Sequence, residues 1–171
     1  MEQANEVNVE VENSHYFSPS SLKLLIMSIC TFGLYELYWC YKNWVHIKEK
    51  KKLEIMPFWR AFFAPLWLYS LMTHLQDEIN ETKIPIVLHA GLLAALYFIT
   101  QLLYRLPDPY WLISLLSFVF LLPANTAILR LNENSATDVK PNDKIQGWNW
   151  LAVILGGLLF IMALIGTFIP A

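Results

Sequence analysis

A single carboxyl group inside an apolar run is the residue of this chain with the clearest chemical interest. Residues 22–41 carry only two formal charges, Lys23 near one edge and Glu36. A bilayer core requires about twenty residues of helix, so the run has the length of a membrane span. An acidic group within a span is costly and is by default a hypothesis of function. The chemistry expected of Glu36 is the binding of a proton or a cation.

A structural role for Glu36 is the alternative, and the sequence favours it. On a helix, Gly33, Glu36, Cys40 and Asn43 share one face, so the carboxyl group is expected to face protein rather than lipid. There it would pair with an arginine, or bond as a neutral acid to a tyrosine, and hold helices in register. Arg60, which follows the basic loop, is the candidate partner.

Three further polar side chains lie in other apolar segments: His89, Gln101 and Asn125. Polar groups in such helices commonly bond across helices, at about 1 kcal/mol or less each, and this is the role predicted for Gln101 and Asn125. His89 could relay protons, because imidazole titrates near physiological pH, but it lies close to a helix end and would also be stable in contact with water.

Lysines are concentrated directly after the first apolar run. Together with Trp44 and the aromatic segment after Pro57 they predict a basic, aromatic-rich surface, and attraction to anionic lipid heads of about 1 kcal/mol per lysine explains it. A specific protein or lipid ligand is the alternative. The lysines predicted to contact lipid heads are Lys48, Lys50, Lys51 and Lys52.

The composition is typical of a membrane protein. Of the 171 residues, 56% are hydrophobic and only 15% are charged. The net charge of -2 gives no basic field that would attract nucleic acid. The sequence contains no phosphate-binding loop, no nucleophile elbow and no histidine or cysteine cluster with metal-ligand spacing. We therefore expect neither an enzyme nor a cofactor or metal site.

These residues are expected to be positioned by an all-α membrane bundle. Residues 1–16 form an acidic, flexible tail, and residues 17–171 form one multi-pass domain. An amphipathic helix at 58–75 is expected to lie in the membrane interface, since its polar positions recur at helical spacing. The four predicted spans are 22–41, 84–104, 110–129 and 148–168.

The distribution of basic residues favours this four-span topology. If the segment 58–75 stays at the surface, nearly all lysines and arginines fall on the cytoplasmic side, and only Lys23 and Arg105 lie outside. Arg105 to Pro109 is short and proline-containing, which predicts a tight hairpin between two spans.

Two alternatives to this topology remain open. The sequences at 57–59 and 79–81 recur in similar form at 109–111 and 131–133, and a true repeat would make the segment after Pro57 a span. Gly33 could also break the first helix, and a re-entrant hairpin at residues 31–33 would move the acidic tail inside.

An aromatic motif surrounds this glycine, and three shorter motifs follow it: Thr31, Gly33, Tyr35, Tyr38, Trp39, Tyr41, Lys42, Asn43 and Trp44, then Pro57-Phe58-Trp59-Arg60, Arg105-Leu106-Pro107-Asp108-Pro109-Tyr110-Trp111 and Leu155-Gly156-Gly157. Together they resemble the core of a widespread bacterial family of small multi-pass membrane proteins, a domain of unknown function. The likeness extends from about Phe17 to the C-terminus and implies a bacterial inner-membrane protein. The family has no established activity, so the resemblance assigns no catalytic or binding residue.

The sequence thus predicts a non-enzymatic protein of the inner membrane that contacts anionic lipid through its basic, aromatic surface. Self-association or an unknown membrane protein partner is expected, because Ala152 and Gly156 repeat the spacing of small residues at helix contacts. The alternative is a small transporter or proton-coupled channel that uses Glu36 and His89.

Overall fold

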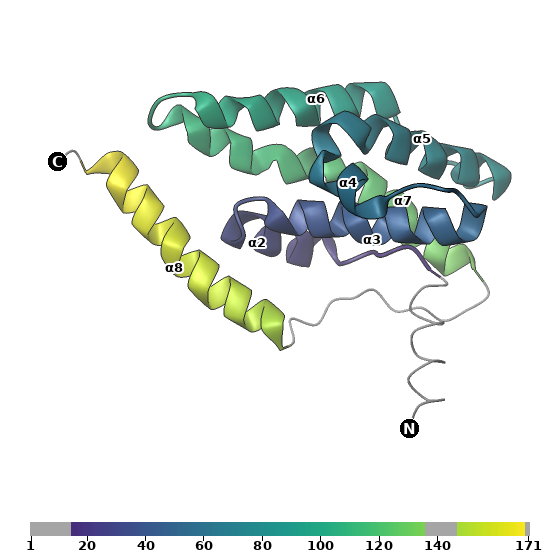
Figure 1. Cartoon of the computed structure of the whole chain (residues 1–171), viewed down its shortest axis with the longest axis horizontal. Helices are drawn as coiled ribbons and strands as arrows, with labels where there is room; N and C mark the ends of the chain where they lie inside the picture. The colour runs from purple at the N-terminus through teal and green to yellow at the C-terminus, as the bar shows by residue number, and fades with distance from the viewer. Residues whose placement is uncertain (1–14, 136–146, 170–171) are drawn as a thin grey trace.

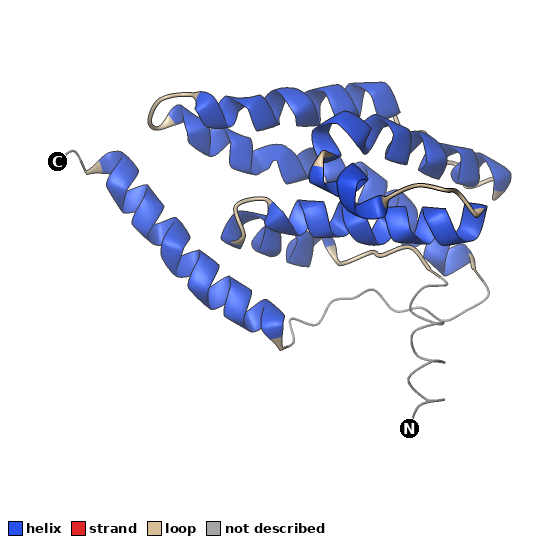
Figure 2. Cartoon of the chain, viewed as in Figure 1, coloured by secondary structure: helices blue, strands red, loops and turns tan. Residues whose placement is uncertain are grey.

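The computed structural model describes residues 15–135 and 147–169, and every regular element in this part of the chain is helical (Figures 1 and 2). The prediction of an all-α fold is confirmed for these residues. The predicted tail lies outside them except at its end, where Tyr16 is buried rather than flexible. The elements are α2 (Ser21–Cys30), α3 (Leu34–Lys51), α4 (Pro57–Phe62), α5 (Ala64–Glu81), α6 (Ala90–Leu102), η1 (Leu103–Arg105), η2 (Tyr110–Leu121), α7 (Leu122–Asn134) and α8 (Trp148–Phe168).

The predicted single span at 22–41 is wrong, because the chain turns back between α2 and α3 (Figure 1). Phe32 and Gly33 both have positive φ angles, 51° and 84°, and glycine adopts this conformation without steric cost. The Thr31 hydroxyl closes the turn by donating to the Met27 carbonyl and accepting from the Tyr35 amide. The ten residues of α2 extend only about 15 Å, about half of a bilayer core. The structure therefore has the hairpin that the re-entrant alternative described.

The predicted interfacial helix at 58–75 is replaced by two helices, α4 and α5. Phe63, with φ −96° and ψ 39°, separates the two helices. A proline lies in the first turn of each helix, where its missing N–H is tolerated. α4 folds back against α3, and α5 packs between α3, α6 and α7. The buried face of α5 makes it a bundle helix rather than one that lies on a surface, and its core side chains are Leu68, Leu71, Met72, Leu75 and Ile79.

The second hairpin joins α6 to η2, as the sequence predicted for residues 105–109. The helix expected from residue 84 begins at Ala90 and continues through η1 to Arg105. After the turn, η2 and α7 form one rod from Tyr110 to Asn134. Residues 57–81, which the repeat alternative would equate with this rod, have a different shape, since α4 and α5 are separate helices.

Among the described residues, two helices are long and apolar enough to cross a membrane, where the sequence predicted four. They are Tyr110–Asn134, with a mean hydropathy of 2.1, and Asn149–Phe168, with a mean hydropathy of 2.5. The first is 44% buried inside the protein, whereas the second is 0% buried. In Figure 1, α8 lies along one side of the bundle, and its main contact is with α2.

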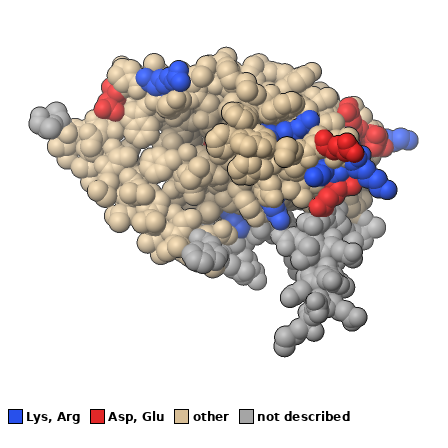
Figure 3. Space-filling model, in the orientation of Figure 1, with Lys and Arg blue, Asp and Glu red and all other residues tan. Residues whose placement is uncertain are grey.

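Charged side chains gather at one end of the bundle (Figure 3), near the point where α3, α5 and α7 end. The turn between η1 and η2, which contains Arg105 and Asp108, lies at the opposite end. The surface between the two ends is mostly uncharged in this view. The bundle therefore has a charged end, an apolar body and a small charged turn.

Candidate functional site

Glu36 lies at the centre of a buried polar cluster, which we call the carboxyl cluster and define as Glu36, Tyr97, Gln101 and Ser117. Glu36 is 0% exposed. The Ser117 hydroxyl lies 3.0 and 2.9 Å from its two carboxylate oxygens and donates to them. Tyr97 and Gln101 also hydrogen-bond to the carboxylate. All three neighbours are neutral groups, so they supply hydrogen bonds without a balancing positive charge.

Three elements bring the carboxyl cluster together. Tyr97 and Gln101 are four residues apart on α6 and so share one face of that helix. Ser117 belongs to η2, and the α6–η2 hairpin places it 3.1 Å from the Gln101 side-chain amide, which donates to it. Gln101 also donates to the Tyr97 hydroxyl at 3.3 Å. Donors on α6 and η2 thus converge on a single acceptor at the start of α3, and hydrogen bonds arranged in this way polarise one another.

A pocket of about 330 Å³ lies beside the cluster, and we call it the hairpin pocket. Gln101 and Ser117 belong to both its wall and the carboxyl cluster. Gly33 is also part of the wall, and a Cβ built on it would lie 3.8 Å from Glu36 Oε1. The remaining lining residues are Phe32, Tyr104, Trp111, Ser114 and Leu115.

The structure does not bring Arg60 to Glu36. Its guanidinium lies between two indoles, 4.5 Å from the ring centre of Trp44 and 4.5 Å from that of Trp67. Trp44 is eight residues beyond Glu36 on α3, which corresponds to about 12 Å along the helix axis. The predicted pairing of Glu36 with Arg60 is therefore wrong, and Arg60 instead joins α4 to α3 and α5 through cation–π contacts.

His89 lies away from the carboxyl cluster as well. It is the exposed residue that precedes α6, and twelve residues separate it from Gln101 on that helix. Twelve residues of helix extend about 18 Å. The structure therefore separates the two groups that the transport interpretation combined.

Asn125 and Gln101 both bond across elements, in the way that the sequence interpretation expected of interhelical contacts. Asn125 is 0% exposed on α7 and accepts from the indole N–H of Trp39 at 3.0 Å. Its amide donates to the carbonyl of Pro19 at 2.7 Å. Asn125 therefore holds α3, α7 and the extended segment before α2 together.

Sequence reasoning missed two further asparagines with the same role. Asn43 accepts from the Phe17 amide at 3.0 Å, and Asn132 donates to the Tyr16 carbonyl at 2.8 Å. We call Asn43, Asn125 and Asn132 the asparagine clamp. The one signal in the sequence is that Asn125 and Asn132 are seven residues apart, which places them on one face of a helix.

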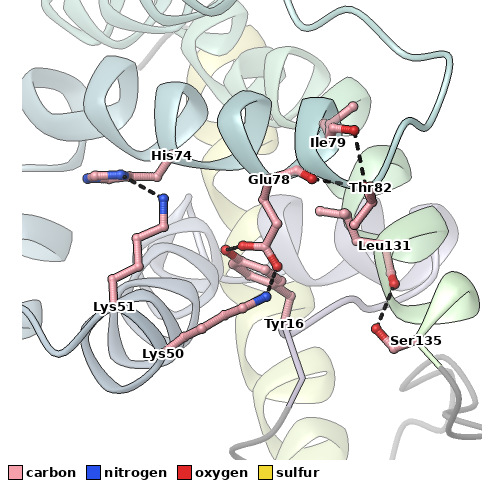
Figure 4. A network of polar contacts seen from close by, with 9 residues as sticks. All are labelled: Tyr16, Lys50, Lys51, His74, Glu78, Ile79, Thr82, Leu131 and Ser135. Carbon is pink, nitrogen blue, oxygen red and sulfur yellow. Dashed lines mark hydrogen bonds and ion pairs between the residues drawn. The ribbon is translucent and has the colours of Figure 1, made fainter.

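The four lysines predicted to contact lipid heads divide into two pairs, and Figure 4 shows one of them, Lys50 and Lys51. Lys50 forms an ion pair with Glu78, and Lys51 lies 3.4 Å from His74 Nδ1. Lys48 and Lys52 are exposed.

Lys50 and Lys51 belong to a network of charged and neutral polar side chains at the charged end. Glu78 also accepts a hydrogen bond of 2.6 Å from the Tyr16 hydroxyl (Figure 4), which ties the segment before α2 to α5. Burial is the largest cause that raises the pKa of Tyr16 well above its ordinary value, and the hydrogen bond to Glu78 is the second. Burial is the largest cause that lowers the pKa of His74, and the charge of Lys51 is the second. The neutral imidazole is therefore the form that accepts a hydrogen bond from Lys51.

Comparison of the chain with protein-family models, with curated proteins and with solved structures finds no match. Within the described residues, no group of three histidine, cysteine, aspartate or glutamate side chains is placed to hold a metal ion. The geometry of the bundle is therefore the basis for inferring a function.

Proposed function

We propose that this chain is a non-enzymatic protein of the bacterial inner membrane that contacts anionic lipid through its charged end. The observation that carries the membrane assignment is α8. In a soluble protein a helix of this length and hydropathy is a buried core helix, but Asn149–Phe168 is 0% buried inside the structure. Lipid is the environment in which such a surface is stable.

A belt of exposed aromatic side chains supports the same placement. It covers α4 and the start of α5, which fold back along α3 from its lysine-rich end. Tryptophan and tyrosine concentrate at the boundary between lipid and water, where their apolar rings and polar groups are both accommodated. The exposed members of the belt are Phe58, Trp59, Phe62, Phe63, Trp67 and Tyr69.

The charged end is the part that would contact lipid heads, and we assign this contact to two of the four predicted lysines. Lys48 and Lys52 are exposed and lie outside the polar network of Figure 4, whereas Lys50, although also exposed, pairs with Glu78 and Lys51 contacts His74. An excess of lysine marks the cytoplasmic side of a membrane protein. We therefore assign the charged end to the cytoplasm, with Lys48 and Lys52 directed to anionic heads.

Retention of lipid from mixed nanodiscs tests this proposal. The protein is placed in nanodiscs with equal amounts of phosphatidylglycerol and phosphatidylcholine, and native mass spectrometry then measures the lipids that remain bound. Phosphatidylglycerol should be retained in excess. The double variant Lys48→Gln/Lys52→Gln should lose about thirtyfold in that preference, because each of the two lysines contributes about 1 kcal/mol near an anionic surface.

The matched control is Arg105→Gln, which removes one exposed positive charge from the opposite end of the bundle. It should retain the preference of the unaltered protein. Equal retention of the two lipids by the unaltered protein would contradict the proposal, and so would an equal effect of the control.

The structure gives less support to transport by Glu36 and His89, because about 18 Å of helix separates His89 from Gln101, a member of the carboxyl cluster that lines the pocket. Membership of the bacterial family that the sequence resembles stays a prediction, as does association with a second copy or with another membrane protein. A second copy would find apolar surface on α8, where large side chains such as Leu151, Ile154 and Leu158 are exposed.

A further inference from the structure

We propose that the hairpin pocket binds a small organic ammonium ion, with Glu36 as its counter-charge. This inference is independent of the lipid contact proposed above, since it concerns the end of the bundle opposite Lys48 and Lys52. The ligand class is a methylated or alkylated ammonium group, either free or as the head of a lipid.

The first step is the charge balance of Glu36. Its carboxyl group is fully buried, and the groups that hydrogen-bond to it, Tyr97, Gln101 and Ser117, are neutral. A buried carboxylate is stable when a positive charge lies close to it. A cation in the neighbouring pocket supplies that charge.

The second step is the route from the pocket to the carboxylate. Gly33 forms part of the pocket wall, and a side chain there would begin 3.8 Å from Glu36 Oε1 and 4.0 Å from Gln101 Nε2. Because glycine has no side chain, the pocket extends to the edge of the carboxyl cluster. Gln101 and Ser117 line both, so a ligand in the pocket touches groups that bond directly to Glu36.

The third step is the chemistry of the walls. Phe32 and Trp111 present aromatic rings, and aromatic faces attract weakly hydrated organic cations. Small metal ions instead require several oxygen ligands, and the described residues offer no group of three acidic, histidine or cysteine side chains. The combination of aromatic walls with a single buried carboxylate therefore favours an ammonium ion over a metal ion.

Arg105 directly follows Tyr104 of the pocket wall, and its position fits this assignment. It is exposed, its Nε donates to the Tyr104 hydroxyl at 3.1 Å, and its guanidinium lies 5.6 Å from the Tyr104 ring centre. Solvent screens an exposed charge of this kind. Because Arg105 already occupies a face of Tyr104, we assign the ligand to Phe32 and Trp111.

Calorimetry of the full chain in dodecyl maltoside tests the proposal, because this detergent carries no ammonium group. Choline is the probe, and its neutral isostere 3,3-dimethylbutan-1-ol is the comparison. Choline should bind and raise the midpoint of thermal unfolding, whereas the isostere should do neither. Absence of choline binding, or equal binding of the isostere, would overturn the proposal.

Two variants and their matched controls locate the site. Glu36→Gln should weaken choline binding at least about tenfold. The control Asp108→Asn removes a negative charge from the adjacent turn and should leave choline binding unchanged. Trp111→Leu should weaken choline binding by about tenfold or less while leaving Glu36 in place. Its control is Trp150→Leu, which changes an exposed tryptophan of α8 and should leave choline binding unchanged.

The outcomes of the variants separate this proposal from a folding defect and from the lipid proposal. If Glu36→Gln does not yield a monodisperse helical protein, the result for Trp111→Leu decides, and unchanged binding there refutes the site. Lys48→Gln/Lys52→Gln should bind choline normally. A third titration with glycerophosphocholine identifies the source: affinity equal to that for choline indicates a lipid head, and weaker affinity indicates a free ammonium compound.

Discussion

Three buried asparagines make an extended segment of the chain part of the core. The backbone of residues 16–19 lies in no helix or sheet, yet Tyr16 and Ser18 are buried. A buried peptide group without a partner costs about 1–3 kcal/mol, and asparagine can satisfy both kinds of group because it carries a donor and an acceptor. At the residue scale, the asparagine clamp therefore replaces the hydrogen bonds that secondary structure would have provided.

Asn125→Ala should lower the free energy of unfolding by about 3 kcal/mol, because it leaves the Trp39 indole and the Pro19 carbonyl buried without their partner. The measurement is the midpoint of unfolding in detergent, followed by circular dichroism. Thr126→Ala is the matched control, since the neighbouring Thr126 is exposed and bonds only within its own helix turn. Equal midpoints for the two variants would show that the clamp does not stabilise the fold.

At the scale of elements, the contact between α2 and α8 depends on one glycine. A Cβ on Gly156 would overlap the carbonyl oxygen of Cys30, so the two helices approach backbone to backbone. Close approach through small residues is typical of helix contacts in membranes, where van der Waals packing rather than a hydrophobic driving force holds helices together. Phe32 and Phe160 pack edge to face next to this contact, with ring centres 6.2 Å apart.

Gly156→Ala should separate α8 from α2, because a backbone carbonyl cannot move aside as a side chain can. The half-buried thiol of Cys30 reports the change, and its rate of alkylation should rise in a Cys40→Ala background. Gly157→Ala is the control, since its Cβ would lie 3.9 Å from Cys30 Sγ, an ordinary contact. A rate that is the same in both variants would mean that α8 is not held at this point.

At the scale of the whole molecule, the α2–α3 hairpin changes the expected topology. A span at 22–41 would have placed the start of α2 and the end of α3 on opposite sides of the membrane. The hairpin instead returns the chain, so the segment before α2 and the basic end of α3 lie on the same side, and Tyr16 bonds to Glu78 there. Among the described residues, the η2–α7 rod and α8 are the helices long and apolar enough to cross a membrane.

Cysteine labelling tests this arrangement in spheroplasts of a bacterial host. In a background with Cys30→Ala and Cys40→Ala, an impermeant maleimide should label Asp108→Cys in intact spheroplasts, because a cytoplasmic charged end, as we propose, puts the η1–η2 turn outside. It should label Ser135→Cys, at the end of α7, only after lysis. Labelling of Ser135→Cys in intact spheroplasts would contradict this topology and favour the repeat alternative, in which the segment after Pro57 spans the membrane.

The sequence by itself determined the class of fold, the bounds of α8 and the start of η2. Apolar runs, the prolines at the starts of α4 and α5 and the glycine of the α2–α3 turn act on neighbouring residues, so their effects can be read locally. The same kind of signal identified Glu36 as a buried acid and predicted the turn before η2. It could not decide between a broken and a continuous first helix, because glycine permits both.

Only the tertiary structure decided which polar groups meet. Ser117 is 81 residues from Glu36, and Pro19 is 106 residues from Asn125, so no spacing in the sequence connects them. Arg60 is the arginine nearest to Glu36 along the chain, but it lies between two indoles instead. The physical reason is that helical periodicity fixes the face on which a side chain lies, whereas its partner depends on how the faces of distant helices pack.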